Sequence, residues 1–86
     1  MKESLLAFPC RFPIKAMGRR EDGFEQLVFG LVKTHVPELE AAQLSTRPSR
    51  GGTYLAVTVN ITARSQGQLD KIYRDLTGHH AVLMAL

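Results

Sequence analysis

The sequence predicts an α+β fold in which two helices cover one face of an antiparallel sheet. Three observations lead to this prediction. The chain has 86 residues, and because domains usually need ~100–200 residues, residues 1–86 are expected to form a single domain. Apolar residues make up 44% of the chain and charged residues 22%, which is typical of a globular protein. Segments with apolar residues at every second position alternate with segments that repeat every third or fourth position.

The first strand is predicted over residues 11–17, where apolar residues alternate with charged residues and proline. Its apolar positions are Phe12, Ile14 and Ala16. Pro13 cannot donate a hydrogen bond to a neighbouring strand, so we expect it at the start of the strand or at a bulge. Gly18 is expected to end the strand in a turn.

The first helix is predicted to run for about 13 residues and to end at Pro37. Its apolar positions are Phe24, Leu27, Val28, Leu31, Val32 and Val36. Asp22 is expected to cap the helix, with the Glu25 side chain returning the contact as in a capping box. Gly30 is expected to allow close approach of the helix to the sheet.

A hairpin is predicted next, from a short strand over residues 43–47, a turn over 48–52 and a long strand over 54–63. Proline and glycine in the turn favour a reversal of the chain. In the long strand the apolar series Leu55, Val57, Val59, Ile61 and Ala63 alternates with Tyr54, Ala56, Thr58, Asn60 and Thr62. One face of this strand is therefore expected to be buried.

A second helix and a last strand complete the pattern. Ser65 is expected to cap the helix, with Gln68 as its reciprocal partner, and Gly78 is expected just after its end. Its apolar positions are Leu69, Ile72, Tyr73 and Leu76, and the strand over residues 80–86 is expected to place Val82, Met84 and Leu86 on one face.

Right-handed crossovers and the hairpin then give the strand order 4-1-3-2, with both helices on one side. This is a ferredoxin-like β-α-β-β-α-β sandwich whose other sheet face is open.

The chain resembles the YbeD-like family of small bacterial proteins from about residue 5 to residue 86. The residues in which the resemblance lies are Phe8-Pro9, Phe12, Lys15-Ala16-Met17-Gly18, Arg47-Pro48-Ser49, Gly52-Thr53-Tyr54, Val57-Thr58, Ile61-Thr62-Ala63, Leu69, Ile72-Tyr73, Leu76, Val82, Met84 and Leu86. The resemblance implies a ferredoxin-like fold similar to the ACT regulatory domains. It implies a family without an assigned molecular function, for which metabolic, lipoate-related regulation is an expectation only.

No cofactor or metal site is predicted. His79 and His80 are adjacent in a segment expected to be extended, so their side chains should point to opposite faces. His35 suits the last turn of the first helix, where a cation is favourable. Cys10 has no second ligand at a zinc-site spacing and no nearby signature of a catalytic partner. The chain is therefore expected not to be an enzyme.

One enzymatic alternative is an acylphosphatase-like phosphate site. Gly18-Arg19-Arg20 would follow the first strand and Asn60 lies on the third. The glycine-rich loop of those enzymes is absent, and Asn60 lies on the wrong strand.

The second alternative is an RNA-recognition domain, which has the same topology. Arg50-Gly51 and Tyr54 match part of its third-strand signature, but the other aromatic residues that would stack on bases are missing.

The chain is expected in the cytoplasm. The segment before Pro9 has too short an apolar run for a signal peptide, and no run approaches the ~18 apolar residues of a membrane span. A lone cysteine is typical of reducing compartments.

The leading hypothesis is a regulatory or protein-interaction module that acts through the open sheet face or the loop after the first strand. Lys and Arg number 11 against 8 Asp and Glu, and several of the basic residues fall in the strands and loops. Binding residues are expected at Lys15, Met17, Gly18, Arg47, Ser49, Tyr54 and Thr58, with Ser45, Leu83 and Ala85 on the same face. The expected partner is an acidic protein, a second copy of the chain or a small anionic ligand.

Overall fold

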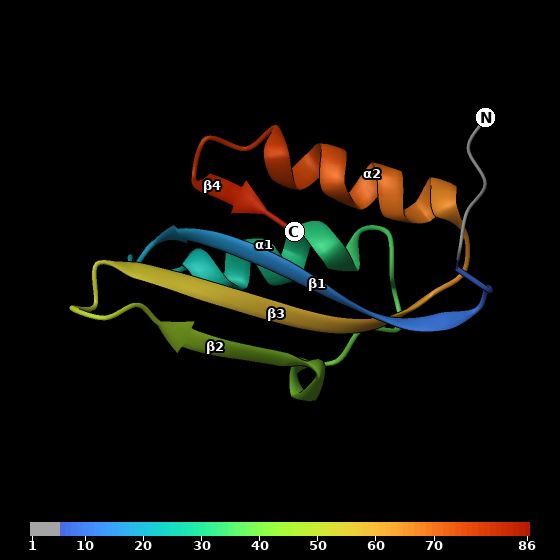
Figure 1. The fold of residues 1–86 in the computed structure, drawn as a ribbon, viewed down its shortest axis with the longest axis horizontal. Coiled ribbons are helices and arrows are strands. Elements are labelled where there is room, and N and C mark those ends of the chain that lie inside the picture. The colour runs from blue at the N-terminus through green and yellow to red at the C-terminus, as the bar shows by residue number, and fades with distance from the viewer. Residues whose placement is uncertain (1–5) are drawn as a thin grey trace.

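The computed structural model describes residues 6–86 (Figure 1), so most of the segment assessed for a signal peptide lies outside the described residues. Its elements are β1 (Cys10–Arg19), α1 (Phe24–Lys33), the short 3-10 helix η1 (Ala41–Gln43), β2 (Leu44–Pro48), β3 (Tyr54–Ala63), α2 (Gln66–Thr77) and β4 (Val82–Ala85). The strands form one antiparallel sheet in the order β2-β3-β1-β4. This confirms the predicted topology, and β2 and β4 are the edges.

The core lies between the sheet and the two helices. Alternation along β3 buries the five predicted apolar residues, and each is at most 8% exposed. Ile14 and Ala16 of β1 lie on the same side. The helices contribute Phe24, Val28, Val32, Leu69, Ile72 and Leu76. The opposite side of the sheet has no helix over it.

Replacing Val59 with alanine tests this assignment of faces. Val59 is fully buried in β3, so the loss of two methyl groups is expected to lower the free energy of unfolding by about 1–3 kcal/mol. Thr58→Ala, one position along and on the open face, is the control and is expected to change it by less than about 0.5 kcal/mol. Urea unfolding of the two variants measures the difference, and equal losses would contradict the assignment.

The prediction for the end of β1 was wrong, because the strand continues through Gly18 to Arg19. Gly18 is buried, and a Cβ atom there would lie 2.4 Å from Cε1 of Phe24 and 2.5 Å from the backbone oxygen of Ala81. The absence of a side chain therefore serves close packing against α1 and the segment before β4 instead of a turn.

Pro13 lies inside β1, neither at its start nor at a bulge. Lys15 exchanges backbone hydrogen bonds with Leu86 on the β4 side, and in an antiparallel ladder Pro13, two residues away, faces the same side. The register of β4 stops short of Pro13, so its missing N–H removes no bond within the sheet.

A register shift in β4 overturns the predicted faces of the last strand. Met17 pairs with Met84, whereas Gly18 pairs with Val82, so Leu83 is an extra residue in a bulge. Val82 therefore faces the core while Met84 lies on the open face beside Met17. Leu86, opposite Lys15, follows Met84 onto the open face, and Ala85 instead packs against the core.

The first helix begins and ends differently from the prediction. Its N-cap is Gly23, with φ of +89°, and no side chain caps it, so the Asp22–Glu25 capping box is absent. The helix ends at Lys33, before Pro37. Beyond it the backbone N–H groups of His35 and Val36 bond three residues back, to Val32 and Lys33, and Lys33 Nζ donates to the backbone oxygens of Pro37 (2.9 Å) and Leu39 (2.7 Å). Gly30 is exposed and touches nothing in the sheet.

The second helix has the predicted N-cap, because Ser65 Oγ accepts a hydrogen bond from the backbone N–H of Gln68. The Gln68 side chain does not return that contact to Ser65. Its Oε1 accepts from the backbone N–H of Arg64, and its Nε2 donates to the backbone oxygen of His35. Gly78 follows the helix as predicted but with a right-handed conformation.

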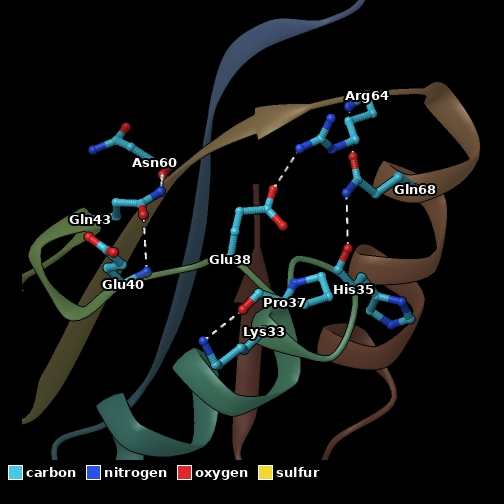
Figure 2. Close-up of polar contacts among 9 residues, drawn as sticks. All are labelled: Lys33, His35, Pro37, Glu38, Glu40, Gln43, Asn60, Arg64 and Gln68. Atoms are coloured by element: carbon cyan, nitrogen blue, oxygen red, sulfur yellow. Dashed lines mark hydrogen bonds and ion pairs between the residues drawn. The ribbon is translucent and has the colours of Figure 1, made fainter.

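A polar network fastens the connection between α1 and β2 (Figure 2). Gln68 holds its start at His35, and Arg64 Nη2 lies 3.1 Å from Glu38 Oε2. At its end, Gln43 Nε2 donates to the backbone oxygen of Asn60 while Gln43 Oε1 accepts from the Glu40 N–H. These contacts fix the position at which the edge strand β2 begins.

Candidate functional site

The open face of the sheet is basic and, within the strands, has no acidic residue. The strand sequences contain no Asp or Glu in any of the four strands. On the open face they present Arg11, Lys15 and Arg19 from β1 and Arg47 from β2, all exposed. Such a surface attracts acidic partners.

The register brings most of the predicted binding residues together. One row across the sheet runs Ser45, Thr58, Lys15. The next row runs Arg47, Ala56, Met17, Met84. Tyr54 lies opposite Arg19 at the end of β3. Lys15, Met17, Arg47, Tyr54, Thr58 and Ser45 therefore share one surface, and we call these six residues the basic face.

Apolar side chains border the basic face at the β4 edge. Leu83, Met84 and Leu86 are 58%, 51% and 68% exposed, and Tyr54 is 38% exposed. The sequence prediction missed Met84 and Leu86, because strict alternation placed them in the core and only the bulge moves them. Exposed apolar groups inside a charged rim are typical of protein interaction surfaces.

Two of the predicted binding residues have structural surroundings instead. Gly18 is buried beneath Phe24 and forms no loop. Ser49 closes the hairpin: its N–H donates to the Tyr54 oxygen and its Oγ accepts from the Tyr54 N–H. Neither residue lies with the basic face as an open polar group.

The structure separates the groups that an acylphosphatase-like site would need. Arg19 pairs with Tyr54 and Asn60 pairs with Pro13, six positions away along β1, which corresponds to about 20 Å. The Arg20 N–H donates to the Thr53 oxygen instead of facing an open phosphate loop.

The base-stacking surface of an RNA-recognition domain is reduced to one ring. In the four described strands Tyr54 is the aromatic residue on the open face, and Phe12 packs on the helix side. Stacking of successive bases on aromatic rings supplies much of the affinity of such domains.

The histidines are arranged differently from the prediction. His79 and His80 lie in a turn, and their rings stack with centroids 4.7 Å apart, so they do not point to opposite faces. His35 lies beyond the helix end and pairs with Asp75 of α2, with Nε2 and Oδ2 2.6 Å apart. No group of three or more His, Cys, Asp or Glu residues suited to a metal ion occurs within residues 6–86.

Tyr73, on α2, forms a hydrogen bond with the residue that follows β4. Its hydroxyl donates to the backbone oxygen of Leu86. Burial raises the pKa of the Tyr73 phenol above its usual value, because desolvation disfavours the charged form.

The Glu38–Arg64 pair predicts a pH dependence of stability. Hydrogen bonds from its own backbone N–H and from Arg64 lower the pKa of Glu38 below 4.5. The ionised carboxylate thus stabilises the fold above the unfolded pKa, and this contribution disappears as pH falls through the lower folded pKa. Compared with wild type, Glu38→Gln is expected to lower Tm at pH 7, and this difference is expected to shrink as the pH falls below the unfolded pKa and through the folded pKa of Glu38.

Thermal unfolding followed by circular dichroism across this range measures the effect. Glu21→Gln is the control, because Glu21 forms no ion pair with any other residue of the described range 6–86. An equal difference between Glu38→Gln and wild type at all pH values would contradict the prediction.

A groove runs between α1 and the edge strand β2. One part, with a volume of about 360 Å³, is lined by Glu25, Gln26, Phe29, Ala41 and Leu44. The adjoining part shares Glu25 and Gln26 and extends along Thr46 and Pro48 to Arg20, Glu21 and Asp22. The groove therefore follows β2 on the side opposite the basic face.

None of the helices within residues 6–86 combines the length and the apolar character that crossing a membrane requires.

Comparison with known proteins connects this chain to bacterial proteins. Residues 3–86 match a family described as "Protein of unknown function (DUF493)". The chain is 47% identical over 85 residues to a UPF0250 protein of Chromobacterium violaceum, covering 99% of this chain and 96% of that protein. It is 46% identical to a UPF0250 protein of Nitrosomonas europaea, covering 99% of this chain and 98% of the relative.

A solved structure is similar in fold. The solution structure of protein HP0495 from H. pylori matches with a TM-score of 0.68 and 14% identity, covering 99% of this chain and 89% of that chain.

Proposed function

The chain belongs to the DUF493 family, as its YbeD-like features indicated, and on this premise we propose that it is a non-enzymatic interaction module that binds an acidic protein partner. The observation that supports the proposal is the basic face. Its strands present Arg and Lys side chains without an acidic residue among them, and apolar groups border it at β4.

The physical chemistry of the face favours a protein partner. Basic side chains steer an acidic surface into contact and contribute most to the association rate and to specificity. The exposed Leu83, Met84 and Leu86 side chains supply apolar area that a protein would bury. RNA could stack a base on only one aromatic ring of this face, that of Tyr54, and a small anion would leave the apolar border uncovered.

The proposal extends to place and role. The sequence has one cysteine, which suits the reducing cytoplasm, and we place the interaction there. Binding an enzyme through this face is one way in which the chain would regulate metabolism, including the lipoate-related regulation that its family resemblance implies.

Reversing charge on the basic face tests the proposal. Lys15→Glu with Arg47→Glu is compared with Lys71→Glu with Arg74→Glu on α2, where both side chains are exposed. The two double variants have the same net charge, so a difference between them reports position alone. Each tagged protein is used to capture proteins from a bacterial lysate at physiological salt, before and after nuclease treatment.

Capture of an acidic protein by wild type and the helix variant, and its loss with the face variant, would support the proposal. The captured partner should dissociate as salt rises, because exposed charges are screened. Equal capture by both variants would overturn the proposal, and loss of capture after nuclease treatment would favour the RNA alternative.

A further inference from the structure

The outer edge of β2 has backbone groups available for another strand. β2 is the last strand of the sheet on this side (Figure 1). The Lys15 N–H and C=O face β4 and so point away from β3. The partner of Lys15 on β3, Thr58, therefore points its N–H and C=O toward β2. Ser45, the partner of Thr58, accordingly faces β3, and so does Arg47 two residues further along. The Leu44 N–H already donates to the backbone oxygen of Ala41. The Leu44 C=O and the N–H and C=O of Thr46 therefore form the outward edge.

Both faces of β2 are accessible as well as its edge. Ser45, Thr46, Arg47 and Pro48 are exposed and Leu44 is half-buried, because α1 and α2 lie over the other strands. On the helix side the groove beside α1 runs the length of the strand. Phe29, Ala41 and Leu44 make the end of the groove where β2 begins apolar.

An added strand would place alternate side chains on the two sides of β2. Those on the open side would lie beside Arg47 at the edge of the basic face, and an opposite charge on them would attract the Arg47 side chain, so acidic side chains are favoured there. Those on the other side would enter the groove beside Phe29 and Leu44, where apolar side chains are favoured. A second copy of β2 would instead bring another Arg47 and no acidic residue to the open side.

We propose that β2 binds an extended segment of the partner as a fifth strand, and that this segment alternates acidic and apolar side chains. The inference rests on the proposed function and specifies the shape and chemistry of the acidic partner. Main-chain hydrogen bonds to the Leu44 C=O and to the N–H and C=O of Thr46 would provide affinity, and the two rows of side chains would provide specificity.

The test uses a short acetylated peptide of alternating glutamate and valine, titrated into the full-length chain labelled with nitrogen-15. Amide exchange is expected to slow at Thr46, whose N–H points outward. It is expected to change little at Leu44, whose N–H is bonded to Ala41, and at Ser45 and Arg47, which face β3. Thr46→Pro removes one outward N–H, and Thr46→Val, which keeps it, is the matched control. The proline variant is expected to bind about 2- to 10-fold more weakly than the valine variant.

Further variants separate backbone pairing from charge. A peptide of alternating lysine and valine is expected to bind more weakly than the glutamate peptide, and Arg47→Glu is expected to reverse that preference. If Thr46→Pro fails to fold, peptides whose backbone nitrogens are methylated on one edge of the extended peptide or on the other replace it. Methylation of the edge that faces β2 is expected to abolish binding, and methylation of the opposite edge is not.

Two results would overturn the inference. One is the absence of any amide change at millimolar glutamate–valine peptide. The other is peptide binding that changes the amide chemical shifts of Lys15 and Tyr54 without slowing exchange at Thr46, and with equal affinity for Thr46→Pro and Thr46→Val. That second result would leave the proposed function standing. Failure of the proposed function is recognised separately, by equal capture with the face and helix charge variants.

Discussion

Replacing Ile72 with alanine is expected to lower the free energy of unfolding by about 2–5 kcal/mol. Ile72 lies on α2 and is fully buried against the sheet, so the variant loses apolar burial and leaves a cavity. A chain of this length has a total stability of about 4–13 kcal/mol. This single change therefore removes a large share of the total.

Urea denaturation, fitted with one shared m value for all variants, measures the loss of stability in Ile72→Ala. Lys71→Ala is the control, because Lys71 neighbours Ile72 on α2 but is exposed, and it is expected to change stability by less than about 0.5 kcal/mol. Similar losses for the two variants would mean that α2 does not dock on the sheet as described.

Replacing Gly18 with valine is expected to destabilise the protein by about 1–3 kcal/mol or more. The added side chain would overlap the Phe24 ring and the Ala81 backbone oxygen, and Phe24 is itself buried in the core. Relief of the first overlap requires the Phe24 ring or α1 to move, and relief of the second requires the backbone before β4 to move.

The cause of the Gly18 effect is tested by a double-mutant cycle. Gly18→Ala, Phe24→Leu and the double variant are compared by thermal unfolding. Because the two sites are in contact, the double variant is expected to lose less stability than the two single losses together. Strict additivity would show that the Phe24 ring is not what excludes a side chain at Gly18.

The sequence was sufficient for the topology because each element has a local signal. β3 has ten residues of uninterrupted alternation, and Ser65 caps α2 through a residue only three positions away. The strand order then follows from general rules of handedness and hairpin formation.

The errors arise where distant contacts decide the structure. Gly18 resembles a strand break until Phe24 and Ala81 are placed beside it, and His35 resembles a helix-end cation until Asp75, 40 residues later, is brought to it. The Leu83 bulge cannot be seen from alternation alone, because it depends on how β4 pairs with β1.

The candidate site was predictable in its centre and not at its border. Parity along the long strands placed Lys15, Met17, Tyr54 and Thr58 on one surface, and the pairing of β2 with β3 added Arg47. A shift of one residue in β4 exchanges Ala85 for Met84 on that surface. The apolar border therefore depends on tertiary pairing.

Within residues 6–86 every acidic side chain lies on a helix or a connection and none on a strand, so charge is distributed unevenly over the molecule. The net charge is +3, and the charged side chains that the strands present on the open side are all positive. A cation-exchange surface would therefore hold the protein in one orientation, with the sheet toward the resin and the helices outward. Retention on such a column would exceed that of a protein with the same net charge spread evenly, and a partner approaching from solution would be turned toward the sheet before contact.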